Sequence, residues 1–279
     1  MKLFADSCSD ISIKDLNQRD IDVLPLKITI DDTDYLDQVE ITSEEVLEAI
    51  SNNKRPLTSQ ANPENFIEAF KPYVEKGEDI IYIAFSSELS GTYNSSVIAR
   101  DELLEAHPDA SITVIDTKSA SYGLGMIVED ADDDIKAGKS KDEVIKNIEK
   151  NIERIVHLFT VSDLDYLAKG GRLSKGQAFL GGLLNIKPLL HVENGRLVPL
   201  EKHRGVKKVI SSMVNHVNED KGKGRARITH ANAGELAEQV KEKILAETEI
   251  EDIQISMIGP TISSHTGNGT VALFYYKED

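Results

Sequence analysis

The chain has 279 residues, 40% of them hydrophobic and 29% charged, a composition typical of globular proteins that bury a large core. Its net charge of −16 at pH 7 disfavours binding to nucleic acid and to anionic membranes, while leaving room for one anionic ligand in a local site. Its one cysteine, Cys8, excludes an intramolecular disulfide, and no signal peptide or apolar run of about 20 residues is evident, so we expect a cytoplasmic protein without a membrane span.

The first half alternates predicted strands with predicted helices. Strands are expected over 2–6, 21–30, 79–85 and 110–116, and helices over 42–53, 62–77, 91–108, 121–138 and 140–155. The run "DIIYIAF" is apolar throughout, as in a strand buried on both faces of a parallel sheet. This order predicts an N-terminal parallel sheet with helices on both faces.

Several helix starts carry capping signals. Thr42 and Glu45 form the pattern of a capping box, and Asn62 precedes Pro63 as an N-cap precedes the first helical position. Ser140 is the expected cap of the helix that leads into the second half.

The second half predicts a mixed α/β domain. A strand over 155–161 is followed by helical material broken by glycine pairs over 163–186, and "ENG" predicts a hairpin turn within 187–204. A helix over 205–220 precedes strand, helix, strand and strand over 224–232, 234–248, 250–259 and 270–278. We therefore predict two domains, 1–155 and 156–279.

A serine-rich turn, "SSELSGTYNSS", follows the buried strand 79–85. Ser90 lacks the preceding glycine of a nucleophile elbow, and no lysine between 81 and 117 could meet a phosphate. The start of a helix with hydroxyls suits an anion of low charge, such as a carboxylate. The alternative is that Ser90 only caps the helix.

Three further stretches offer polar candidates, each with a structural alternative. Thr58 and Ser59 lie in a predicted loop between helices and could face the same anion or only form a turn. His265 lies in a predicted turn before the last strand, and the scattered histidines give metal binding little support. Arg172 lies in "AKGGRLSKG", a solvated loop unless it serves a partner. The apolar stretch 176–190 could be plain core or could line a cavity.

Together these stretches resemble the DegV family. "DSCSD", "TSQ", "SSELSGTYNS", "DYLAKGGR", "GLLNIKPLL", "GRLVPLEKHR" and "HTGNG" occur in the family's order from about residue 5 to the last strand. The resemblance implies a two-domain α/β protein that binds a long-chain fatty acid between its domains. In Gram-positive bacteria such proteins are the non-catalytic binding subunit of fatty acid kinase, whose ATP-using subunit makes acyl phosphate for phospholipid synthesis.

The resemblance also implies roles for single residues. Thr58 and Ser90 match the hydroxyls that hold the carboxylate, His265 matches a histidine beside that head group, and Arg172 matches an exposed arginine that contacts the kinase. No cofactor and no metal are implied.

The sequence departs from the family pattern in two places. Ala61 and Asn62 follow "TSQ" where the family usually has proline and serine, and Asn268 replaces a proline in the last turn. Both changes could alter the stiffness of a loop, but they leave the proposed hydrogen-bond donors in place.

Two rival functions remain open at this point. A serine esterase or hydrolase would use Ser90, His265 and an acid such as Asp6, although no elbow motif supports it. A phosphate or nucleotide protein is a third possibility, disfavoured by the absence of lysine near the turn.

Overall fold

A computed structural model describes residues 1–174 and 186–278. The N-terminal part is built on a parallel sheet in the order β2 (Asp22–Leu24), β1 (Lys2–Asp6), β6 (Ile80–Ala84) and β7 (Ile112–Asp116). Every residue of β1 and β6 is buried, as the continuous apolar run predicted.

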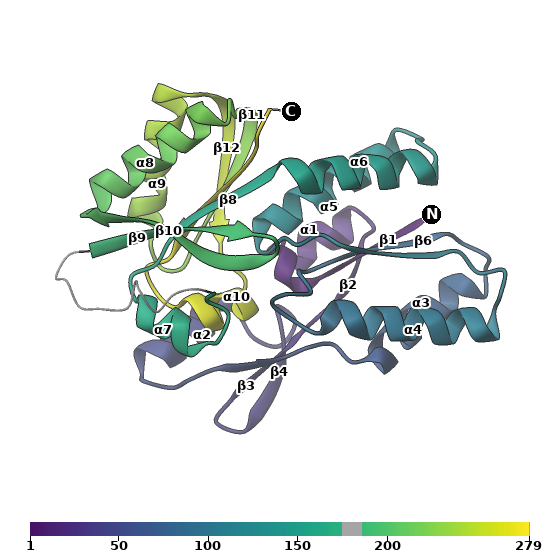
Figure 1. Ribbon diagram of the computed structural model, residues 1–279. Helices are drawn as coiled ribbons and strands as arrows, with labels where there is room; N and C mark the ends of the chain where they lie inside the picture. Colours follow the sequence, from purple (N-terminus) through teal and green to yellow (C-terminus); the bar gives the residue numbers. More distant parts are fainter. Residues whose placement is uncertain (175–185, 279) are drawn as a thin grey trace.

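Helices cover both faces of this sheet (Figure 1). On one face, α3 (Pro63–Val74) and α4 (Thr92–Ala106) pack through Phe66, Phe70 and Leu103 against Phe4 and Tyr82. The opposite face is covered by α1 (Ile13–Gln18), α5 (Tyr122–Lys136) and α6 (Lys141–Arg154), and a short helical turn η1 (Ser7–Ser9) follows β1. The predicted arrangement of this sheet and its helices is confirmed.

The predicted caps are present. Thr42 accepts from the backbone N–H of Glu45 at the start of α2 (Ser43–Ser51), and the Glu45 carboxylate accepts from the backbone N–H of Thr42. Asn62 and Ser140 begin α3 and α6 with the same reciprocal pattern. Because these bonds join residues three apart, the local sequence suffices to specify them.

A second, mixed sheet of six strands begins at Ile155. Its order is β10 (Arg196–Arg204), β9 (Ile186–Glu193), β8 (Ile155–Thr160), β13 (Val271–Tyr276), β11 (Lys223–His230) and β12 (Glu249–Met257). Only β11 and β12 pair in parallel among the described strands of this sheet. The predicted hairpin joins β9 and β10 through Asn194 and Gly195, both with positive φ, as a turn of this kind requires.

The two sheets are joined by shared packing. Helices α8 (Val206–Glu219) and α9 (Gly234–Glu247) cover one face of the second sheet, while α5 contacts strands of both sheets. Figure 1 shows α5 between the N-terminal sheet and the six-stranded sheet. A helix buried on several sides must be apolar on more than one face, and Gly123, Leu124, Met126 and Ile127 are all buried.

Three predictions of local structure are wrong. The run 21–30 is not one strand, because the chain turns at Pro25 and its two ends join different sheets as β2 and β3 (Lys27–Ile30). β3 lies between β4 (Thr33–Leu36) and β5 (Leu57–Ser59), so Thr58 lies on a strand and not in a loop. His265 lies on the last turn of a helix, α10 (Pro260–Thr266), in a stretch predicted as a turn.

Candidate ligand cavity

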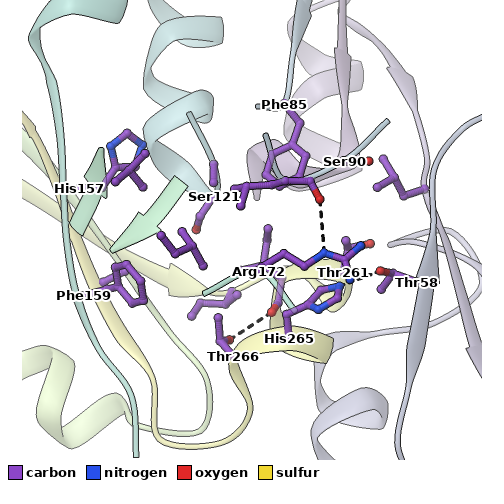
Figure 2. A pocket seen from close by; sticks show the side chains of 18 of the residues that line it. Thr58, Phe85, Ser90, Ser121, His157, Phe159, Arg172, Thr261, His265 and Thr266 are labelled. Carbon is purple, nitrogen blue, oxygen red and sulfur yellow. Dashed lines mark hydrogen bonds between the residues drawn. The ribbon is translucent and has the colours of Figure 1, made fainter. Parts of the chain in front are cut away.

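A cavity of about 300 Å³ lies between the two sheets. This volume is at the lower end of the range for small-molecule sites. Most of its lining is apolar and comes from both halves of the chain: Leu26, Phe85, Leu89, Ala120, Phe159, Val192, Leu197, Ile258, Ile262, Ala272 and Phe274. Three polar side chains, Thr58, Ser90 and His265, lie together on one side of the cavity (Figure 2). The expectation that 176–190 lines a cavity falls largely on residues outside the described ranges.

Thr58 and His265 are hydrogen-bonded across the cavity wall. Their Oγ1 and Nε2 atoms are 2.7 Å apart, although the residues are 207 positions apart in the sequence. Strand β5 presents Thr58 and the last turn of α10 presents His265; α10 packs against α2, β3 and β5. Burial, together with the positive charges of Arg172 and Arg55, lowers the pKa of His265 to about 4. The imidazole is therefore neutral at pH 7.

Ser90 lines the same side of the cavity, immediately before α4. Its Oγ is 2.9 Å from Thr92 Oγ1 and accepts from the Thr92 backbone N–H at 3.3 Å. The hydroxyl therefore takes part in the helix start and also borders the cavity. The next residue, Gly91, has no room for a side chain, since a Cβ there would lie 1.9 Å from Gln60 Oε1.

Arg172 is partly buried and lines the cavity, which differs from the exposed position that the resemblance implied. Its Nε donates to the carbonyl of Leu89 at 3.3 Å and its Nη1 to that of Gly170 at 2.9 Å. Figure 2 shows the side chain reaching between Phe85 and His265. Arg172 therefore adds positive charge to the polar side of the cavity.

The groups of the rival hydrolase are not arranged as a triad. The Asp6 carboxylate is fully buried and accepts from the Tyr82 hydroxyl and the Phe85 N–H, each at 2.7 Å. Burial raises the pKa of Asp6 to about 6. His265 is bonded to Thr58, and among the described contacts no hydrogen bond joins it to Ser90. The nucleophile–base–acid chain that such catalysis needs is thus absent from the described residues.

One buried histidine of the cavity was missed by sequence reasoning. His157 lines the cavity from β8, with its Nε2 2.7 Å from Ser119 Oγ. Burial, with a smaller effect of His191, lowers the pKa of His157 to about 3. The signal in the sequence was a single polar residue within the apolar strand "IVHLFTV", which is too weak to separate a cavity-lining position from a core position.

The departures from the family pattern have local roles. Ala61 is buried in the core under α3, and Asn62 forms that helix's capping box. The Asn268 amide donates to the carbonyl of Leu47 at 3.1 Å and to Ser51 Oγ at 3.2 Å. It thereby ties the turn after α10 to α2, as a proline could not.

Neither a metal site nor a membrane-spanning helix is found among residues 1–174 and 186–278. No three or more His, Cys, Asp or Glu side chains in those ranges are grouped to hold a metal ion. In the same ranges, no helix has the length and apolarity needed to cross a bilayer.

Comparison with known proteins gives one consistent result. A family model described as an uncharacterised protein of the DegV family matches residues 1–278. A DegV domain-containing protein of Clostridium perfringens is 41% identical over 279 residues, covering 98% of this chain and 96% of the relative.

Solved structures of similar proteins agree with the fold. A DegV family protein of Thermus thermophilus, described by its fatty acid binding, has a TM-score of 0.92 at 30% identity and covers 99% of both chains. A DegV family protein of Eubacterium eligens, solved with heptadecanoic acid, has a TM-score of 0.87 at 27% identity and covers 100% of both chains.

Proposed function

The chain belongs to the DegV family, and on that premise we propose that it binds a long-chain fatty acid in the cavity between its two sheets. The tail lies among the apolar side chains, and Thr58, Ser90 and His265 hold the carboxylate. The observation that carries this proposal is the cavity lining, which is mostly apolar and has Thr58, Ser90 and His265 together on the side where Arg172 and Arg55 supply positive charge.

The tail can supply most of the affinity. A palmitate-length chain has roughly 14 methylenes, and burial of each is worth about 0.8 kcal/mol, so full burial contributes about 11 kcal/mol before the costs of binding. The head group then needs only to be hydrogen-bonded and not tightly clamped.

The polar side of the cavity suits a carboxylate. Thr58 and Ser90 have hydroxyls that can donate to it. The neutral His265 can donate its Nε2–H to Thr58 Oγ1, which leaves the Thr58 hydroxyl hydrogen for the carboxylate. Arg172 and Arg55 provide positive charge nearby, since both lower the pKa of His265. Two nitrogens of Arg172 already donate to backbone carbonyls, so a carboxylate is attracted without a ready-made bidentate pair.

Native mass spectrometry of the purified protein tests the binding proposal. We expect a mass increment matching one long-chain fatty acid, released on denaturation and identified by its fragmentation. Protein stripped of lipid should regain the increment when incubated with palmitate or oleate. A protein that carries no lipid and takes none up would contradict the proposal.

The bound acid is presented to a separate ATP-dependent fatty acid kinase subunit, and this chain is itself non-catalytic. A loosely held carboxylate remains a better nucleophile toward ATP than one locked by an arginine pair. Replacing Thr58 and Ser90 together by Ala should therefore reduce acyl phosphate formation more than it reduces lipid retention. Equal losses in the two assays would count against presentation by these hydroxyls.

Arg172 is the proposed kinase contact. Arg172→Gln, which removes the charge without placing a carboxylate beside the head group, should weaken kinase turnover far more than lipid retention. Lys208→Gln, the same change at an exposed position on α8, should change neither. Because Arg172 also lines the cavity, lipid retention must be measured beside turnover. Loss of lipid in the Arg172 variant would assign the residue to the cavity and refute the kinase role.

A further inference from the structure

A second imidazole borders the cavity on the side away from the proposed carboxylate site. His157 and Phe159 are two residues apart on β8, so their side chains leave the strand on the same face, and both line the cavity. The alternate residues Val156 and Leu158 pack on the other face, in the core under α8 and α9. Figure 2 shows His157 and Phe159 across the pocket from Thr58 and Ser90. This side would receive the hydrocarbon part of a bound fatty acid.

His157 has one paired and one unpaired nitrogen. Its side chain is deeply buried, at 5% exposure for the residue, and Nε2 is bonded to Ser119 Oγ at 2.7 Å. Among residues 1–174 and 186–278, Nδ1 has no hydrogen-bond partner. Nδ1 is not among the fully buried atoms that lack a partner, so water can reach it. An occupant that displaces this water leaves Nδ1 unpaired unless it offers a hydrogen bond, so an occupant that pairs with Nδ1 is favoured over one that does not.

Several other polar side chains of the cavity interior are already paired, whereas Thr261 Oγ1 is buried without a hydrogen-bond partner among the described residues. Ser121 donates to the carboxylate of Asp10, and the hydroxyls of Thr266 and Thr270 donate to the backbone carbonyls of Ile262 and Thr266. Phe274, by contrast, meets the His157 ring edge-on, with centroids 5.5 Å apart, and offers it no hydrogen bond. The spare nitrogen of His157 is therefore a polar point in a largely apolar region.

The chemistry of the imidazole selects the group that could meet it. Burial keeps His157 neutral, so it does not favour a second carboxylate. Ser119 can donate to Nε2, which leaves Nδ1 as a donor, or accept from it, which leaves Nδ1 as an acceptor. A hydroxyl both donates and accepts, so it pairs with either tautomer, whereas a ketone pairs with one alone.

Resting on the proposed function, we propose that this cavity accepts a long-chain fatty acid with a hydroxyl on its tail, and that His157 Nδ1 is the partner of that hydroxyl. His157 is then a specificity-determining residue of the tail region. It acts at a distance from the residues that hold the carboxylate.

Competition binding with matched acids tests this. Lipid-stripped protein is titrated with stearic acid and with a series of stearic acids that carry one hydroxyl at different carbons. For at least one hydroxyl position, wild type should bind the hydroxylated acid within about threefold of stearic acid or more tightly, because the hydroxyl's lost hydration is replaced. In His157→Phe, which keeps a ring of similar size, that acid should weaken by about tenfold relative to stearic acid, or about 1.4 kcal/mol. His157→Asn, whose amide can occupy the Nδ1 position, should restore part of the preference.

The outcomes separate this inference from the function on which it rests. If wild type binds stearic acid but binds every hydroxylated acid more than about tenfold more weakly, the inference is overturned without any variant. It is also overturned if the ratio of the two affinities is equal in wild type and His157→Phe at every hydroxyl position. If no acid binds at all, the proposed function itself fails and the inference falls with it.

Discussion

Two histidines, His265 and His157, line the cavity on opposite sides (Figure 2), each within hydrogen-bond distance of a hydroxyl, and their surroundings differ more than these bonds do. His265 is 2.7 Å from Thr58 Oγ1, and His157 is 2.7 Å from Ser119 Oγ. Burial lowers the pKa of both, to about 4 and about 3. Only the first pair is also influenced by two arginines, Arg172 and Arg55.

Two hydrogen bonds of the same length can therefore lie beside two different kinds of ligand atom, depending on the charges around them. Beside the arginines, a negative carboxylate gains electrostatic energy, since opposite charges in a partly buried site attract more strongly than in water. Beside Phe274 and Phe159, a charge would be costly, and an uncharged methylene or hydroxyl is favoured. This difference in electrostatic surroundings is the basis of the proposed orientation, with the carboxylate beside His265 and the tail beside His157.

The largest expected effect comes from filling the apolar side. Ala272 lies on β13 and lines the cavity, so Ala272→Phe should displace about four methylenes of the tail and cost about 3 kcal/mol, on the order of a hundredfold in affinity. Fatty acid affinity measured by titration checks this. The matched control is Ala246→Phe, an exposed position on α9, which should bind normally. Equal affinity in both variants would place the tail elsewhere.

The buried imidazole of His157 should make stability depend on pH. Its pKa in the folded protein, about 3, lies below the ordinary value of 6.5, so protonation favours the unfolded chain and stability is lost as pH falls below about 6.5. The free energy of unfolding of His157→Phe minus that of wild type should therefore be about 2 kcal/mol larger at pH 4.5 than at pH 7, since only wild type is destabilised by protonation of this imidazole. Denaturant unfolding at the two pH values measures it.

Protonation of other buried groups stabilises the folded protein instead of destabilising it. The measurement therefore compares variant with wild type at each pH, because one protein at two pH values would mix these effects. Burial raises the pKa of Asp10 to about 8 and of Asp37 to about 6, so those carboxyls favour the folded state as pH falls. Their contribution is common to wild type and variant and cancels in the difference. A difference that does not change between the two pH values would contradict a neutral buried His157.

Removing the hydroxyl partner should affect the two pairs unequally. Ser119→Ala leaves His157 Nε2 without a partner in a dry setting, so unfolding free energy should fall by about 1.5 kcal/mol. Thr58→Val removes the partner of His265 where the pair borders the polar side of the cavity, and the loss should stay below about 1 kcal/mol because water can replace the hydroxyl. Thermal and chemical unfolding measure both. A larger loss of stability for the Thr58 variant would contradict the conclusion that His157 lies in the drier of the two environments.

The smallest effect is a change in titration on loading. A bound carboxylate should raise the pKa of His265 above its ligand-free value, because the opposite charge favours imidazolium, and should leave that of His157 unchanged. NMR titration of the two imidazoles, with and without palmitate, measures this. A change at His157 instead would place the carboxylate on the other side.

Much of the architecture was predictable because it depends on neighbours in the sequence. The capping residues Thr42, Asn62 and Ser140 act on backbone groups three residues away, and the turn at Asn194 and Gly195 needs only their positive φ. The split of 21–30 between two sheets was not predictable, since an apolar run does not record which strand it pairs with. Helix α10 is seven residues long and rich in Ser and Thr, so it lacks a clear helical period.

The sequence by itself determined the α/β class, the order and ends of most helices, and the family to which the chain belongs. Only the tertiary structure decided that Thr58 meets His265 across 207 residues, and that Arg172 and His157 line the same cavity. The reason is physical. Caps and turns are set by bonds within a few residues. The cavity instead lies between sheets built from distant parts of the chain, so the burial and charge of each side chain there depend on all of them.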